Sequence, residues 1–463
     1  MFHINSQTPK GLRIIIVGCG KVGKTLIEQL SREGHDIIII DHDSAKIEEI
    51  TNMYDIMGIT GNGASYSVQK EAGIEAADLI IAVTESDELN LLTCTIAKQV
   101  GNCAAIARVR TPDYSKEVGY LREKLGLAMI INPELEAAKE AARILYLPTA
   151  LEVSTFAHGQ AELIKFKVPE NNVLDGMTIA HLGGRFAPNL LVCAIERDGE
   201  VYIPSGNFQI QKGDIFSFVS TPKSARKFLK TIGFNTKQVR NSMIIGGGKA
   251  AYYLADQLIR MGIDVKIIES DRKRCEELSV LLPEAVIING DGTNQDLLKE
   301  EGIETIESFI PLTGIDEENI MLTLHAKSVS NAKVITKINR ITFSDVISQL
   351  DLGSVIYPKY ITSEAIIAYV RAKTASIDSN IETLYHMFDQ RVEAIEFRVY
   401  EENPKLTNIP FKDLALKDKL LVAFICRNGS IIIPGGQDYI QVGDAVMIVT
   451  AHTGFRDILD ILR

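Results

Sequence analysis

The chain repeats itself, and this internal duplication constrains its fold more than any other feature. The stretch IIIVGCGKVGKTLIEQLSREGHDIIIIDHD, which begins at Ile14, returns as SMIIGGGKAAYYLADQLIRMGIDVKIIESD, which begins at Ser242. In each copy an apolar run is followed by a glycine-rich turn, an amphipathic stretch and a second apolar run that ends near a carboxylate. This alternation predicts a strand, a helix and a second, parallel strand in each copy.

Later segments repeat in the same order. GNGASYSVQKEAGIEAADLIIAVT matches GDGTNQDLLKEEGIETIESFIPLT, and GEVYIPSGNFQIQKGDIFSFVST matches GSIIIPGGQDYIQVGDAVMIVTA. The second pair has short β-branched runs between turn residues, which indicates a small β-rich module. We therefore expect two Rossmann-like lobes with doubly wound parallel sheets, alternating with two small α+β lobes. The expected parts are an α/β lobe over 11–131, a linking helix over 132–149, a small lobe over 150–235, an α/β lobe over 240–357, a linking helix over 358–376 and a small lobe over 380–463.

The first glycine-rich turn has the spacing of a dinucleotide-binding loop. Gly18 permits a tight turn, Gly20 lets backbone N–H groups approach a pyrophosphate, and Gly23 allows close packing of helix and strand. The helix that follows offers unpaired N–H donors to phosphates. Asp41 ends the next strand, where a carboxylate accepts hydrogen bonds from a ribose diol and repels a 2′-phosphate. We therefore expect NAD(H) or an adenine nucleotide in preference to NADP(H).

The second copy varies this pattern. GGGKAA has Ala251 at the third glycine position, which the fingerprint tolerates, and Glu269 replaces Asp41. We expect this loop to bind a nucleotide as well.

Further candidate positions follow later strands, since open α/β sheets bind ligands at the carboxyl ends of their strands. Glycine turns follow the third strand, threonines close the fourth, and a cation ends the fifth, where it could reach a phosphate or simply lie on the surface. These candidates are Gly61, Asn62, Gly63, Thr84 and Arg108 in the first copy and Gly290, Asp291, Gly292, Thr313 and Lys337 in the second.

Composition narrows the function classes. The 463 residues carry a net charge of −11, no Trp and no long basic run, which disfavours binding to nucleic acid or to an anionic membrane surface. We expect neither a signal peptide nor a membrane span, because no apolar run is long enough. The six cysteines show no CxxC and are typical of reduced thiols in the cytoplasm, so we expect no disulfide frame and no metal site.

No catalytic group is evident. A hydride-transferring enzyme needs an acid or base aimed at the nicotinamide, yet only a short β-rich module follows each α/β lobe. The histidines, such as His35, His158, His181 and His325, have no ligand-like spacing and are more often structural in such a context. Cys19 is interpreted as a small residue in a tight turn. The chain therefore looks like a sensor that binds nucleotides without transforming them.

These motifs resemble a known family. IIIVGCGKVGKTL, TESDELN and ARVRTPDY in the first half, with GGGKAAYYLADQL and GDGTNQDLL in the second, are similar to the TrkA family, over about Gly11 to Arg463. Its members are tandems of RCK (KTN) domains, each with a Rossmann-like N-terminal lobe and a TrkA-C lobe. The resemblance implies a non-enzymatic, cytoplasmic regulatory subunit at the inner face of the membrane. It also implies a homo-oligomeric, commonly tetrameric, gating ring under a TrkH/TrkG-like subunit that translocates potassium (or sodium).

The resemblance also implies regulatory ligands, namely NAD(H), ATP and ADP, and the residues that contact them. Family members usually have a small residue such as Ala at the position of Cys19, and often glycine at that of Ala251. The contacts implied are Gly18, Cys19, Gly20, Lys21, Val22, Gly23, Asp41, Gly61, Asn62, Thr84, Asp87 and Arg108, and in the second lobe Gly246, Gly247, Gly248, Lys249, Ala250, Glu269, Asp291, Thr313 and Lys337.

Three other functions stay open. An NAD-dependent oxidoreductase could use the same loops and would turn over NADH. A soluble ligand-binding protein would have no membrane partner. A separately made cytoplasmic part of a channel would also carry such lobes.

Overall fold

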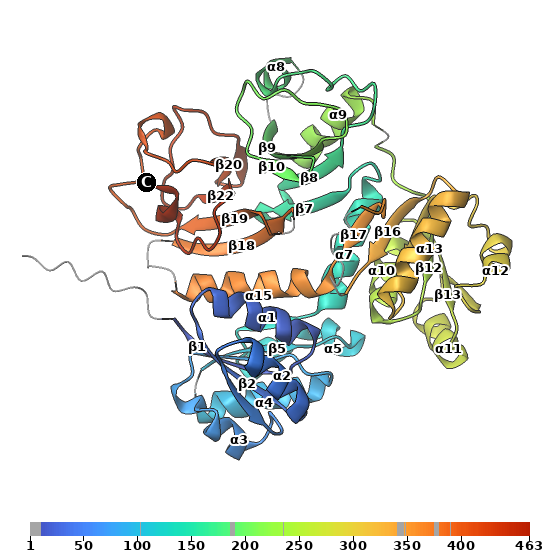
Figure 1. Ribbon diagram of the computed structural model, residues 1–463, viewed down its shortest axis with the longest axis vertical. Helices are drawn as coiled ribbons and strands as arrows, with labels where there is room; N and C mark the ends of the chain where they lie inside the picture. Colours follow the sequence, from blue (N-terminus) through green and yellow to red (C-terminus); the bar gives the residue numbers. More distant parts are fainter. Residues whose placement is uncertain are drawn as a thin grey trace, which may run out of the picture. The chain divides into compact units, whose positions relative to one another are not determined.

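The computed structural model describes residues 11–463 except 102, 186–189, 235, 340–346, 348, 375–378 and 389. The chain divides into two compact units, one built mainly from residues 11–137 and the other mainly from residues 138–338 and 364–463. Figure 1 shows the α/β lobe of the first unit in blue. The second unit contains the yellow α/β lobe and the small green and red sheets.

The first lobe is a six-stranded parallel sheet in the order β3-β2-β1-β4-β5-β6. The order reverses between β1 and β4, which is the switch point where such sheets bind ligands. Its strands are β1 (Arg13–Val17), β2 (Asp36–Asp41), β3 (Met57–Thr60), β4 (Leu79–Ala82), β5 (Ala104–Arg108) and β6 (Met129–Ile131). Its helices are α1 (Lys21–Arg32), α2 (Ser44–Met53), α3 (Tyr66–Glu71), η1 (Ile74–Ala76), α4 (Asp87–Val100), α5 (Pro112–Lys116) and α6 (Val118–Leu125).

The second α/β lobe has the same topology, with the strand order β14-β13-β12-β15-β16-β17 and all pairs parallel. Its strands are β12 (Asn241–Ile245), β13 (Asp264–Glu269), β14 (Val286–Asn289), β15 (Ser308–Pro311), β16 (Lys333–Lys337) and β17 (Ser354–Ile356). Its helices are α10 (Lys249–Arg260), α11 (Arg272–Leu281), α12 (Gln295–Glu300) and α13 (Asp316–Val329). The duplicated sequence thus folds into duplicated sheets, as expected.

A helix that begins with proline follows each parallel sheet, namely α7 (Pro133–Tyr146) and α15 (Pro358–Thr374). Proline suits the first helical turn, because the N–H that it lacks would have no partner within the helix. No helix within the described ranges combines the length and the apolar character needed to span a bilayer.

Two five-stranded antiparallel sheets share one topology, β10-β9-β11-β8-β7 and β21-β20-β22-β19-β18. This confirms the predicted fold class. The first small lobe contains β7 (Glu152–Phe156), η2 (Ala157–Gly159), β8 (Ala161–Lys167), α8 (Ile179–Arg185), β9 (Leu190–Arg197), β10 (Glu200–Tyr202), β11 (Ile215–Ser220) and α9 (Pro222–Thr231). The second contains β18 (Ser379–Met387), β19 (Val392–Val399), η3 (Phe411–Asp413), β20 (Leu420–Arg427), β21 (Ser430–Ile432), β22 (Ala445–Thr450) and η4 (Ile458–Ile461).

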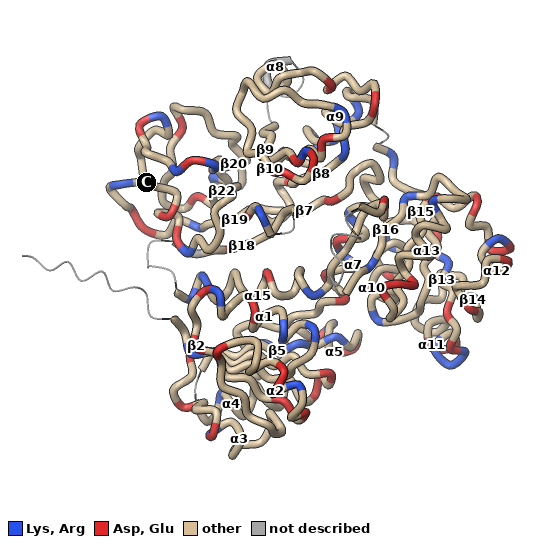
Figure 2. The backbone as a smooth tube through the Cα atoms, in the orientation of Figure 1, with Lys and Arg blue, Asp and Glu red and all other residues tan. Residues whose placement is uncertain are grey.

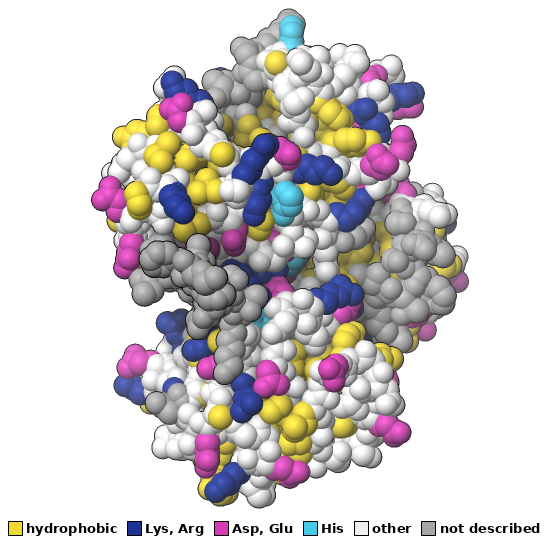
Figure 3. All heavy atoms as spheres, turned by 60° about the vertical axis from the view of Figure 1, so that its left-hand side comes forward, with side chains coloured by type: hydrophobic (Ala, Val, Ile, Leu, Met, Phe, Trp, Pro, Cys, Tyr) yellow, Lys and Arg dark blue, Asp and Glu magenta, His cyan; other side chains and the backbone are white. Residues whose placement is uncertain are grey.

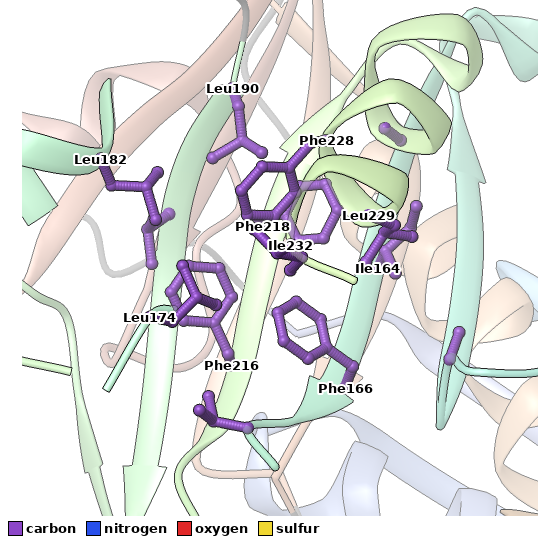
Figure 4. Close-up of a cluster of buried hydrophobic side chains, with 14 of the residues drawn as sticks. Ile164, Phe166, Leu174, Leu182, Leu190, Phe216, Phe218, Phe228, Leu229 and Ile232 are labelled. Carbon is purple, nitrogen blue, oxygen red and sulfur yellow. The ribbon is translucent and has the colours of Figure 1, made fainter. Parts of the chain in front are cut away.

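One face of the first small sheet packs under helix α9. Figure 4 shows Phe166 and Phe218 of the sheet beside Phe228 of the helix. The rings of Phe218 and Phe228 meet edge to face, with centroids 5.2 Å apart. Such aromatic pairs add stabilisation beyond the apolar area that they bury.

The other face of this sheet shares a single hydrophobic core with the second small sheet. Phe156, Leu163 and Val219 of the first sheet belong to the same buried cluster as Phe424 and Met447 of the second. Polar contacts join the sheets too, since the Glu396 carboxylate accepts a hydrogen bond from the backbone N–H of Ala157 at 3.0 Å. The two small lobes are therefore one packed body within this unit.

A buried charge cluster ties helix α15 to the second small sheet. Arg371 of α15 forms a two-pronged ion pair with Glu393 of β19, at 3.1 Å for each nitrogen–oxygen pair. The His386 ring contacts Glu364 of α15 through Nδ1 at 3.2 Å and Glu393 through Nε2 at 3.3 Å. Burial lowers the pKa of His386, but the hydrogen bonds and charges of the two glutamates outweigh it and raise the pKa to about 9.

This cluster predicts a pH dependence. The folded pKa of His386 lies above its ordinary value of 6.5, so the stabilisation is complete below pH 6.5 and is lost as the pH rises through about 9. We expect the free energy of unfolding to fall by about 2 to 3 kcal/mol over that window. His386→Gln should flatten this part of a urea-denaturation profile measured against pH. An unchanged slope in the variant would show that the ring is not protonated in the folded protein.

Candidate functional site

The first glycine-rich loop lies at the carboxyl end of β1, tight against the sheet. Gly18 has φ +110°, and a Cβ there would lie 3.0 Å from the backbone of Val83 and Thr84. A Cβ at Gly23 would lie 1.9 Å from the carbonyl oxygen of Gly18. At Gly20, in contrast, a Cβ would meet nothing within 4 Å. The loop is therefore packed at its two ends and open to solvent in the middle, where the pyrophosphate was predicted.

Helix α1 begins directly after this opening. Gly20 is its N-cap residue and supplies no side chain to cap the first turn, so the N–H groups there are available to an anion. Lys21 is exposed at the first helical position, whereas Val22 packs into the lobe. The loop and the helix end therefore fit a phosphate group.

Asp41 anchors the loop from the neighbouring strand. Its carboxylate is 8% exposed and accepts hydrogen bonds from the backbone N–H of Cys19 at 2.6 Å and of Asp43 at 3.0 Å. Burial, and then the charge of Asp41, raise the pKa of the Cys19 thiol to about 12. Cys19 is thus a neutral packing group, and the carboxylate lies beside the loop where a ribose was predicted.

Asn90 joins the ends of two neighbouring strands, β4 and β5. Its side-chain oxygen accepts hydrogen bonds from the N–H of Thr84 at 2.8 Å and from the hydroxyl of Thr84 at 2.7 Å. Its amide group donates to the carbonyl oxygens of Thr84 at 3.1 Å and Arg108 at 2.9 Å. The guanidinium of Arg108 donates to the same Thr84 carbonyl, and burial lowers the pKa of Arg108 to about 10. Thr84 and Arg108 therefore lie together at the carboxyl edge, held by Asn90.

Two other predicted positions, Asp87 and Asn62, hold nearby loops by accepting hydrogen bonds from backbone N–H groups. The buried Asp87 carboxylate accepts hydrogen bonds from the N–H groups of Arg110 at 2.9 Å and Thr111 at 2.7 Å, so it fixes the loop after β5. The Asn62 side chain accepts a hydrogen bond from the N–H of Ala64 at 2.9 Å and shapes its own turn. At Gly61 a Cβ would lie 2.8 Å from Val68, which explains the glycine as packing against α3.

The second glycine-rich loop repeats this geometry with different side chains. Gly246 has φ +94°, and Gly248 again faces open space. Glu269 accepts hydrogen bonds from the N–H of Gly247 at 2.6 Å and of Asp271 at 2.7 Å, as Asp41 does in the first copy. Helix α10 then begins at Lys249 and Ala250 with no side-chain cap.

The neighbouring strand ends of the second lobe are joined in the same way. Asn319 accepts hydrogen bonds from both the N–H and the hydroxyl of Thr313 at 2.9 Å and donates to the Lys337 carbonyl at 3.0 Å. The Lys337 ammonium donates to the Leu312 carbonyl at 3.0 Å. Asp291 is exposed and caps its own turn through the N–H and hydroxyl of Thr293.

Asn90 and Asn319 were absent from the predicted site. They recur at matching places in TESDELN and TGIDEEN, and both are fully buried. In both copies the asparagine lies on a helix, six residues after the strand-end threonine. This recurrence could have identified both residues from the sequence.

A cavity lies away from the two glycine loops. It has a volume of about 260 Å³ and opens at the opposite, amino-terminal edge of the second parallel sheet, between Asp264, Lys266 and Glu301. Within the described part of the chain, no group of three or more His, Cys, Asp or Glu side chains could hold a metal ion.

Comparison with known proteins decides the family. The TrkA-N domain model matches residues 14–133 and 242–358, and the TrkA-C domain model matches residues 163–233. A Trk system potassium uptake protein TrkA homolog of Archaeoglobus fulgidus is 32% identical over 453 residues, 98% of this chain and 100% of the relative. The chain belongs to the TrkA family.

A further TrkA relative and two solved structures are similar to this chain over nearly its whole length. The Trk system potassium uptake protein TrkA of Haemophilus influenzae is 30% identical over 94% of this chain and 95% of its own length. The structure described as the GsuK channel bound to NAD matches 96% of this chain and 77% of its own, with a TM-score of 0.63 at 17% identity. The crystal structure of the GsuK RCK domain matches 96% of this chain and 93% of its own, also with a TM-score of 0.63 and 17% identity. At this identity the structures establish the fold of the TrkA member described here.

Proposed function

We propose that this chain is the nucleotide-sensing regulatory subunit of a Trk-type potassium uptake system. The observation that carries the proposal is the pair of open glycine loops, each at a switch point and each with a carboxylate hydrogen-bonded to the loop backbone. Relatives over nearly the whole length are named potassium uptake proteins, and structures of the same fold are described as bound to NAD and to ADP. The proposed ligands are accordingly NAD(H), ATP and ADP.

The proposed roles follow from the geometry. Gly20 and Gly248 admit the phosphates, and the uncapped ends of α1 and α10 supply N–H donors. Asp41 and Glu269 lie where they can accept hydrogen bonds from the ribose hydroxyls. The bound nucleotide supplies charge and shape, and in this proposal no group of the chain acts on it chemically. On the face drawn in Figure 3, the charged and hydrophobic side chains of the described residues intermingle.

Regulation would work by differential affinity. A nucleotide that binds one conformation of the assembly about 100-fold better than another shifts that equilibrium by about 2.7 kcal/mol per site. We propose that the assembly is a homo-oligomeric, tetrameric ring beneath a TrkH/TrkG-like membrane subunit, on the cytoplasmic side. Co-purification of the chain with such a subunit would support this partner, and a chain that never associates with it would contradict it.

The experiment that tests the binding sites is calorimetry with NADH, NAD, ATP and ADP on Gly20→Asp and Gly248→Asp variants. Each variant places a carboxylate where a phosphate should lie, so each should abolish one class of binding site. Gly20→Ala and Gly248→Ala are the matched comparisons, because a methyl group meets no protein atom there and carries no charge. We expect a smaller loss of affinity in these variants than in the aspartate variants, because the methyl group crowds a phosphate without repelling it electrostatically. Unchanged binding in both aspartate variants, or consumption of NADH, would refute the proposal.

A further inference from the structure

The surroundings of the two glycine loops differ at three corresponding positions. These are Cys19, Asp41 and Lys46 in the first copy and Gly247, Glu269 and Arg274 in the second. The first two differences depend on one another. A Cβ at Gly247 would lie 3.0 Å from Cγ of Glu269 and 2.7 Å from Cδ1 of Leu278, so glycine in the loop leaves room for the longer acid.

The third difference places a guanidinium against the second loop. Arg274 Nε donates to the Gly247 carbonyl at 2.7 Å, and Nη1 contacts Glu277 at 2.9 Å. Its side chain is only 24% exposed, and within the described ranges its hydrogen bonds leave Nη2 available. Lys46, in contrast, is 45% exposed and its ammonium lies 3.6 Å from Asp43, and among the described residues it makes no hydrogen bond to the first loop.

The segments that follow the two carboxylates also differ in charge, and the second copy is the more positive. Residues 41–46 (DHDSAK) hold two acids and one lysine, whereas residues 269–274 (ESDRKR) hold two acids and three basic side chains. Figure 2 shows basic residues gathered at α11. Two glutamates follow in both copies, Glu48 and Glu49 or Glu276 and Glu277, so they do not cancel the difference. The second site is therefore the more positive at the ribose end.

We propose that the second site accepts an adenine nucleotide that carries a phosphate on the adenosine ribose, and that the first site rejects it. Arg274 is the specificity-determining residue. A carboxylate alone at this position repels such a phosphate, but a nearby arginine accommodates it. Arg274 is already held in place at the loop, and a guanidinium binds phosphate with a planar pair of donors. This inference rests on the proposed nucleotide-binding function.

The test compares three probes by calorimetry on the full chain, namely adenosine 5′-monophosphate, adenosine 5′-diphosphate and adenosine 2′,5′-bisphosphate. In Gly20→Asp, where only the second site is intact, we expect the 2′,5′-bisphosphate to bind about tenfold more tightly than the monophosphate. In Gly248→Asp, where only the first site is intact, it should bind more weakly than the monophosphate.

Variants of Arg274 in the Gly20→Asp background identify the residue responsible. Arg274→Met should remove the tenfold preference, measured as the ratio of the two affinities, so that the loss of the contact with the Gly247 carbonyl acts on both probes alike. Lys46→Met is the matched control, in which the ratio should not change. Arg274→Lys keeps the charge but not the planar fork, so it should keep part of the preference. It also provides the test if the methionine variant does not fold.

Three outcomes would overturn the inference. They are equal binding of the two compounds at the second site, a preference that survives Arg274→Met, and an equal loss of 5′-diphosphate affinity in that variant, which would mean that the arginine contacts the 5′ phosphates. Failure of every probe to bind the wild type would instead refute the proposed function itself. Binding of the monophosphate without any preference would refute the specificity alone.

Discussion

Replacement of Arg371 by methionine is expected to lower the free energy of unfolding of the unit that contains the small sheets by about 3 to 5 kcal/mol. The arginine is 4% exposed and its partner Glu393 is 1% exposed, so the variant leaves a carboxylate buried without its guanidinium. Burial raises the pKa of Glu393, but His386 and Arg371 together hold it below its ordinary value. Chemical denaturation at pH 7 measures the loss.

The control for this prediction is Arg32→Met. Arg32 is 71% exposed and pairs with Glu28 one helical turn away, so its loss should cost less than about 0.5 kcal/mol. The double variant Arg371→Met with Glu393→Gln should recover part of the stability, because the buried charge is then removed as well. A double variant that is less stable than Arg371→Met would contradict the explanation by a buried carboxylate that has lost its guanidinium and keeps only His386.

Replacement of Asn90 by alanine is expected to destabilise the first lobe by about 4 kcal/mol. The variant leaves the N–H of Thr84 and the carbonyl of Arg108 without their Asn90 partner, and each such loss costs about 1 kcal/mol or more in a buried setting. The Thr84 carbonyl loses one of its two donors and keeps the Arg108 guanidinium. It also opens a small cavity, since Asn90 is fully buried. Thermal unfolding followed by calorimetry would measure the effect.

The repeat supplies a second test of the same idea. Asn319→Ala should have a comparable effect on the other parallel sheet, because Asn319 makes the corresponding hydrogen bonds. Asn52 is exposed on helix α2, so Asn52→Ala should change stability by less than about 0.5 kcal/mol. Similar stabilities of the Asn90 and Asn52 variants would show that water replaces the buried amide.

The sequence predicted the sheets well because the information is local. The spacing of Gly18, Gly20 and Gly23 after an apolar strand requires a tight turn into a helix, and its recurrence at Gly246 and Gly248 indicates the second sheet. The surroundings of the loops were harder to predict. Whether Arg108 reaches a ligand or the backbone depends on side-chain contacts between strands that are far apart in the sequence.

The packing of the small sheets was also missed, although the strands carry a signal. LLVCAIER in β9 and LLVAFICR in β20 are apolar on nearly every residue, not on alternate ones. A strand of this kind is covered on both faces. One cover of the first small sheet is α9, and the other is the second small sheet, which no local pattern identifies.

The shared core makes the two halves of the chain depend on one another. A chain cut after residue 235 would expose Phe156, Leu163 and Val219 to water, and the remaining half would expose Phe424 and Met447. Each such side chain forfeits about 1.5 to 3 kcal/mol when its burial is lost. Neither half can therefore be inherited, expressed or replaced on its own without a new partner for that face. The two nucleotide loops are thus held at a strict one-to-one ratio by the architecture of a single polypeptide.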